Sequence, residues 1–169
     1  MKKILVAIAG SANDPFALQE IVRRFEADHQ MEVHLAHVEL PLPADIAHLT
    51  SRDSRKGYHH DHAERAMAPA RAVLDHHSIP YAQHVVMGDR AEQLTQLARR
   101  LNCEEIVMAT GRKNALTRLI ESSVTDKVLQ ITTVPVEVVA GAPMTGWERF
   151  GIPAAVGAAV AAAAAVVLD

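Results

Sequence analysis

The chain has 169 residues, of which 49% are hydrophobic and 22% charged, and its formal net charge at pH 7 is -3. This length is typical of one domain with one substantial core. The small negative charge, the scattered cationic residues and an aromatic content of only 4% argue against a nucleic-acid-binding surface, because such surfaces gather cations and stacking rings.

Short apolar runs and amphipathic stretches alternate along the first 140 residues. Runs such as residues 3–9 lack polar alternation, which is typical of strands buried on both faces. Asn13 or Asp14, followed by Pro15, gives the first amphipathic stretch a helix start. In chain order the predicted elements are a strand at 3–9, a helix from 14 to about 29, a strand at 32–38, a helix at roughly 59–77, a strand at 81–87, a helix at 91–101, a strand at 106–109, a helix over 116–129 and a strand at 134–139.

The segment between the second and third predicted strands is the least regular part of this pattern. Pro41 and Pro43 end the strand, and the polar residues 50–57 are expected to form a mobile loop. The helix that follows contains Pro69, which either kinks the helix or marks the start of its regular part.

The alternation of strands and helices predicts an α/β fold with a doubly wound, five-stranded parallel sheet and right-handed crossovers. Ligands of such sheets bind outside the carboxyl ends of the strands. Here those ends include residues 9–11, 38–39 and 109–111. The loop after the fourth predicted strand has one glycine, Gly111, followed by Arg112 and Lys113, which attract an anion but offer little bare backbone.

Segments spread over residues 3–140 resemble the universal stress protein family in order and spacing. They are ILVAIAGS, HLAHVELP, VVMGDRAEQLTQLA, and IVMATGRKNALTRLIESSVTDKVL followed by VPVEVV. The resemblance implies a Rossmann-like domain of the adenine-nucleotide alpha-hydrolase type and a role in the stress response. Nucleotide-binding members of that family resemble one another in two features. They carry an acidic residue at the end of the first strand and a Gly-x2-Gly-x9-Gly-Ser/Thr signature after the fourth strand.

That nucleotide motif is degenerate in this chain. By the resemblance, the acidic position falls on Ala9, the three glycines fall on Ala109, Arg112 and Ser122, and the final hydroxyl falls on Ser123, which alone is kept. The Ala9 methyl group accepts no hydrogen bond from a ribose or adenine, and the Cβ atoms at the glycine positions crowd phosphates that need bare backbone. The complete candidate cofactor-binding site is Ala9, Gly10, Val38, Ala109, Gly111, Arg112, Ser122 and Ser123.

We therefore expect a universal stress protein that acts by binding a ligand or a protein partner, without enzymatic turnover and without tight ATP binding. Two alternatives stay open, namely an ATP-binding member that uses the nucleotide as a switch and a membrane-anchored regulatory adaptor. No cofactor is firmly predicted, and weak binding of ATP or another adenine nucleotide, aided by Arg112 and Lys113, stays open.

No catalytic or metal site is predicted, although the chain has ten histidines. The segment 59–64, HHDHAE, places His59 and His62 on one helical face. A closed metal site needs further ligands and supporting groups, and the neighbouring sequence offers none. His34 and His37 lie at odd spacing on the second predicted strand, so they are expected on opposite faces of the sheet.

The last predicted strand, Val134 to Val139, carries Pro135, which suits an edge position. In the family that the chain resembles, this strand commonly pairs with its copy in a second subunit, which implies a homodimer.

Residues 1–140 are predicted as the stress-protein domain and residues 141–169 as a linker with an Ala-rich apolar helical tail. The uncharged run 151–168 is near the lower length limit for crossing a bilayer, so membrane association and packing on the domain or a partner both stay open. Cys103 is the single cysteine and the N-terminus shows no secretory signal, so a cytoplasmic location is expected.

Overall fold

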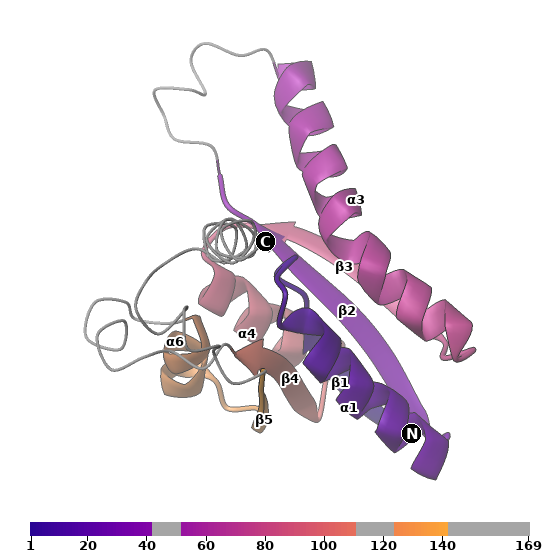
Figure 1. Ribbon diagram of the computed structural model, residues 1–169. Helices are drawn as coiled ribbons and strands as arrows, with labels where there is room; N and C mark the ends of the chain where they lie inside the picture. Colours follow the sequence, from indigo (N-terminus) through magenta and orange to yellow (C-terminus); the bar gives the residue numbers. More distant parts are fainter. Residues whose placement is uncertain (42–51, 111–123, 142–169) are drawn as a thin grey trace, which may run out of the picture. The chain divides into compact units, whose positions relative to one another are not determined.

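The computed structural model describes residues 1–41, 52–110 and 124–141, which form a five-stranded sheet flanked by helices (Figure 1). The strands are β1 (Lys2–Ala7), β2 (Met31–Glu39), β3 (Tyr81–Met87), β4 (Glu105–Thr110) and β5 (Val136–Ala140). The helices are α1 (Asp14–Ala27), α3 (Arg52–His76), α4 (Arg90–Leu101) and α6 (Val124–Ile131). All strand pairs are parallel and the order is β3-β2-β1-β4-β5, so the predicted doubly wound α/β fold is confirmed.

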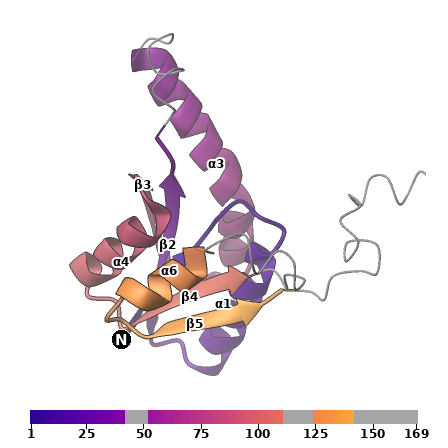
Figure 2. The ribbon, with the colours of Figure 1, turned by 90° about the vertical axis from the view of Figure 1, so that its left-hand side faces the viewer.

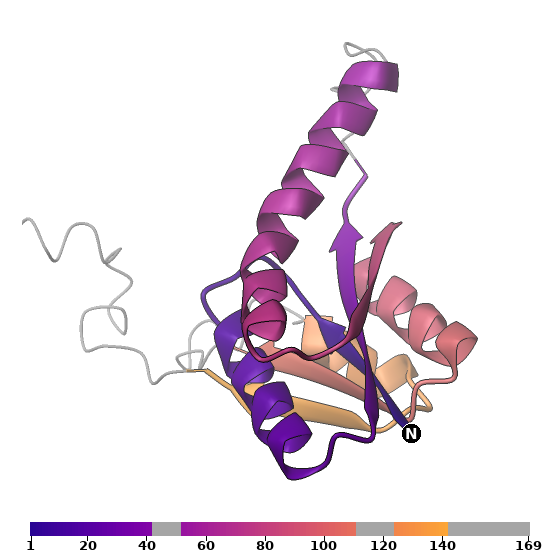
Figure 3. The ribbon, with the colours of Figure 1, turned by 90° about the vertical axis from the view of Figure 1, so that its right-hand side faces the viewer.

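Helices cover both faces of the sheet, which explains why its central strands are continuously apolar. α1 and α3 lie on one face, and α4 and α6 lie on the other (Figures 2 and 3). Successive residues of β1 point to opposite faces, so Ile4 belongs to the core under α1 and Leu5 to the core under α4. Both side chains are fully buried, because neither face of β1 meets water.

The helix α3 begins earlier than the sequence pattern predicts. It starts at Arg52, so the expected loop at 50–57 is helical from that residue onward. The first turns of α3 extend beyond the carboxyl end of β2 (Figure 3). Pro69 lies within the helix, and the helix continues past it to His76.

Smaller differences concern the ends of three other elements. α1 stops at Ala27 instead of about residue 29, and β1 stops at Ala7 instead of residue 9. β5 begins at Val136, after Pro135, whose carbonyl accepts a hydrogen bond from the Ile106 amide at 2.9 Å. Proline has no amide to donate to the ladder, so the strand starts one residue later.

The tail prediction for 142–169 and the first part of the predicted helix at 116–129 lie outside the described residues. Among the helices of the described part, none combines the length and the apolarity needed to cross a membrane.

Candidate functional site

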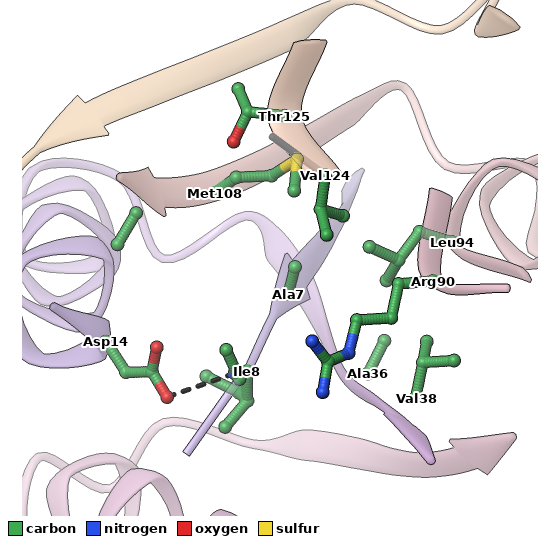
Figure 4. Close-up of a pocket in the computed structure, with 12 residues that line it drawn as sticks. Ala7, Ile8, Asp14, Ala36, Val38, Arg90, Leu94, Met108, Val124 and Thr125 are labelled. Carbon is green, nitrogen blue, oxygen red and sulfur yellow. Dashed lines mark hydrogen bonds between the residues drawn. The ribbon is translucent and has the colours of Figure 1, made fainter. Parts of the chain in front are cut away.

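The strand order reverses direction between β1 and β4, and a pocket of about 110 Å³ lies at their carboxyl ends (Figure 4). In the sheet, β2 and β3 follow β1 on one side, and β4 and β5 lie on the other side of β1. Crevices at such reversal points are the usual ligand sites of doubly wound sheets. The described lining residues are Ala7, Ile8, Ala9, Asp14, Ala36, Val38, Arg90, Leu94, Met108, Ala109, Val124 and Thr125.

The lining is mostly apolar, and Arg90 supplies its one cation among the described residues. Arg90 is the first residue of α4, and its guanidinium group points into the pocket (Figure 4). Arg90 is exposed, and within the described part of the chain it forms no ion pair. An anion that enters the pocket would meet this guanidinium group first.

The opposite wall is built by the loop between β1 and α1, which the Asp14 carboxylate holds together. Asp14 Oδ2 accepts hydrogen bonds from the amides of Ala9 at 3.1 Å, Gly10 at 2.8 Å and Ser11 at 3.1 Å. Its Oδ1 accepts the Ser11 hydroxyl at 2.7 Å. A turn of successive amides at a helix start is a typical phosphate cradle, but here the chain's own buried carboxylate occupies it.

Gly10 adopts φ +71°, a left-handed conformation that glycine reaches without strain. A Cβ atom at this position would lie 3.0 Å from the Cβ of Ala66 in α3. Glycine at this position therefore allows the loop to approach α3 closely and lets the three amides converge on Asp14.

The two helices beside the pocket are tied together by an ion pair. Lys127 Nζ of α6 lies 2.8 Å from Oδ2 of Asp89, whose Oδ1 accepts the Glu92 amide at 3.1 Å and so caps α4. The hydrogen bond from Lys127, followed by that from the Glu92 amide, lowers the pKa of Asp89. This contact fixes the start of α4, and with it the position of Arg90.

Three of the predicted site residues, Ala9, Val38 and Ala109, meet in this pocket. Gly10 instead lines a neighbouring hollow of about 260 Å³ between α1 and α3. The remaining predicted residues, Gly111, Arg112, Ser122 and Ser123, lie outside the described residues.

Sequence reasoning missed Asp14 and Arg90 as pocket residues. The start of a helix that follows a parallel strand faces the carboxyl edge of the sheet, and that signal could have indicated Arg90 after the Gly88-Asp89 turn. Asp14 was expected only as a possible helix cap together with Asn13. Asn13 does occupy the cap position, but its side chain makes no capping hydrogen bond.

The fold and its pocket thus define a doubly wound α/β domain with a ligand crevice at the point of strand reversal. The profile of the universal stress protein family matches residues 1–140, and the chain belongs to this family. The predicted family assignment and its association with the stress response are therefore confirmed.

Known proteins similar to the chain agree with this assignment. The stress response protein NhaX of Bacillus subtilis is 25% identical over 162 residues, covering 81% of this chain and 96% of NhaX. The solved structure of the hypothetical protein MJ0577 has a TM-score of 0.69 at 23% identity, covering 85% of this chain and 98% of that one. A universal stress protein solved in complex with cAMP has a TM-score of 0.60 at 16% identity, covering 82% of this chain and 95% of that one. The two structural matches establish the shared fold.

Proposed function

We propose that this universal stress protein acts in the stress response by binding, without enzymatic turnover and without tight ATP binding. The observation that carries the proposal is the internal carboxylate of Asp14, which takes up the three amides of the β1–α1 loop. A triphosphate would have to displace a buried, fourfold hydrogen-bonded carboxylate and would be repelled by its charge. The Ala9 side chain adds no acceptor for a ribose or an adenine.

Weak binding of an adenine nucleotide is the second candidate function. Arg90 favours it, because an exposed guanidinium group with no ion-pair partner in the described residues suits a phosphate. The universal stress protein solved with cAMP shares the fold of this chain, which adds support for a small nucleotide in the same crevice.

Isothermal titration calorimetry with ATP and with cAMP tests both candidates. We expect no saturation by ATP at micromolar concentrations, and any binding at millimolar concentration should weaken at least fivefold in Arg90→Ala. Arg100→Ala is the matched control, since Arg100 is also exposed but lies near the opposite end of α4. A micromolar Kd for ATP, or adenine nucleotide extracted from the purified protein, would overturn the main proposal.

A protein partner is also part of the proposed function, and a second copy of the chain is the partner that β5 suits best. Within the described residues, β5 pairs only with β4, and its other backbone edge is available for hydrogen bonding. Val138 on this strand is 37% exposed. Pairing of two β5 edges about a twofold axis would give a homodimer.

A further inference from the structure

Four side chains with metal-binding atoms converge beyond the carboxyl end of β2. Glu39 Oε1 lies 2.9 Å from Nε2 of His37 and 2.5 Å from Nδ1 of His62. Glu39 Oε2 lies 3.4 Å from Nδ1 of His59. One ligand atom from each of His37, Glu39 and His62 falls within 4.8 Å of the other two. Two β2 residues are thus brought together with two histidines on one face of α3.

The inner part of this cluster is buried and held in a fixed orientation. The side chains of His37 and Glu39 are only 3% and 6% exposed. Nδ1 of His37 lies 2.8 Å from the carbonyl oxygen of Ile8, so this nitrogen carries the proton that the carbonyl accepts. A histidine that donates one ring N–H to a backbone carbonyl is the usual supporting arrangement of a metal ligand.

The Ile8 contact has an electrostatic consequence for the other ring nitrogen of His37. In the neutral ring, Nε2 carries a lone pair, and that lone pair faces the Glu39 carboxylate at 2.9 Å. Two electron pairs at this distance repel each other unless a positive charge lies between them. A proton on each ring nitrogen that faces Glu39 satisfies the cluster. One divalent metal ion shared by the imidazoles and the carboxylate does so as well.

We propose that His37, Glu39 and His62, with His59 as the fourth ligand, form a binding site for a divalent metal ion of the zinc class. Imidazole nitrogens with one carboxylate are a ligand set that zinc and its neighbours Co²⁺ and Ni²⁺ favour. In a tetrahedral zinc site, bonds of about 2.0 Å place the ligand atoms roughly 3.3 Å apart. The contacts of Glu39 Oε1 with His37 and His62 have to open by less than about 1 Å to reach that spacing.

The outer ligand His62 has the freedom for this adjustment. The His62 side chain is 47% exposed and lies on the solvent side of the cluster. The Tyr58 ring stacks on His62, with ring centroids 6.1 Å apart and an interplanar angle of 15°. Metal binding would join the first turns of α3 to β2, so the ion would stabilise a part of α3 that extends beyond the sheet.

This site is distinct from the pocket beside Arg90. His37 and Glu39 alternate along β2 with Val38, which lines the pocket on the opposite face of the sheet. The metal proposal and the proposed function therefore stand on different observations.

The test uses the full-length chain without a histidine tag, stripped with EDTA and dialysed. We expect calorimetry with ZnCl₂ to give one ion per chain with a micromolar or tighter Kd, and Tm to rise by at least about 3 °C at saturation. Co²⁺ should give the visible absorption bands of a four-coordinate nitrogen and oxygen site. Absence of stoichiometric binding would overturn the proposal.

Single substitutions locate the ion. We expect His62→Ala and Glu39→Gln each to weaken zinc binding at least tenfold, and His59→Ala to weaken it by a similar factor. The matched control is His60→Ala, an exposed neighbour that makes no hydrogen bond to Glu39 in the described residues and should retain full affinity.

Circular dichroism separates loss of a ligand from loss of the fold, and His62→Ala is the safer variant because its ring is half exposed. Zinc affinity that is equal in the unmodified protein and in folded His62→Ala would overturn the site. A drop in His60→Ala as large as that in His62→Ala would also overturn it, because the ion would then bind the exposed histidines without Glu39. Unchanged affinity in His59→Ala would remove His59 as the fourth ligand.

Discussion

At the scale of single residues, the pocket is shaped by a carboxylate that the protein uses on itself. Asp14 is buried and accepts four hydrogen bonds from its own loop, three of them from backbone amides. Hydrogen bonds to an ionised acceptor are stronger than neutral ones, so this single side chain determines the shape of the β1–α1 turn. The same residue denies those amides to an outside anion.

We predict that Asp14→Ala destabilises the protein, because three partly buried amides lose their acceptor at once. The expected loss in the free energy of unfolding is about 1–3 kcal/mol, measured by urea denaturation. Glu104→Ala is the control, since Glu104 is an exposed acid that forms no ion pair in the described part of the chain, and its loss should be below about 0.5 kcal/mol. Equal effects of the two substitutions would contradict the role given to Asp14.

At the scale of elements, one arginine joins a helix to two strands. Arg24 of α1 contacts Glu20 of its own helix at 2.7 Å, Glu105 of β4 at 3.0 Å, and Glu137 of β5. The hydrogen bond from the neighbouring Arg23 is the main reason why the pKa of Glu20 is lowered to about 2. Arg24 therefore lies among three carboxylates that would otherwise repel one another.

We predict that Arg24→Met costs about 1–3 kcal/mol of stability, because Glu105 and Glu137 lose a partly buried cation. Arg23→Met is the matched control on the same helix. Its guanidinium group is largely exposed and contacts only Glu20 among the described residues, so we expect a loss of at most about 1 kcal/mol. Urea denaturation at pH 7 compares the two variants, and a larger loss for Arg23→Met would refute the prediction.

Some elements could be predicted from local sequence patterns and others could not. The five strands were predictable because each contains a short, local group of apolar residues, which is continuous in residues 4–6 of β1. The start of α3 was not predictable, because residues 52–62, RDSRKGYHHDH, contain no helical repeat of apolar residues. Helical periodicity indicates packing, so a helix that leaves the core gives no such signal.

At the scale of the whole molecule, the two edges of the sheet differ in what they offer to a partner. β3 forms one edge and carries Val85, which is 51% exposed, and β5 forms the other edge. The predicted homodimer uses β5, following the family resemblance and the edge of that strand that pairs with no other strand among the described residues.

We predict that the protein is a dimer at micromolar concentration and that Val138→Lys converts it to a monomer, because a charge beside the paired edges has to be desolvated. Val85→Lys places the same charge on the opposite edge and should leave the dimer intact. Size-exclusion chromatography with light scattering measures the mass of each variant. A monomeric unmodified protein, or a dimer that survives Val138→Lys, would rule out pairing through β5.

The sequence by itself determined the alternation of strands and helices, the parallel sheet and the absence of an acidic side chain at Ala9, since each is written in neighbouring residues. Tertiary structure alone decided that Asp14 fills the amide turn and that Arg90 faces the same pocket. It also brought His62 to Glu39 across 23 residues and His37 to Ile8 across 29. Spacing along a chain gives the period of a helix or strand, but the contact between two elements depends on how their apolar faces pack, and only the folded chain fixes that packing.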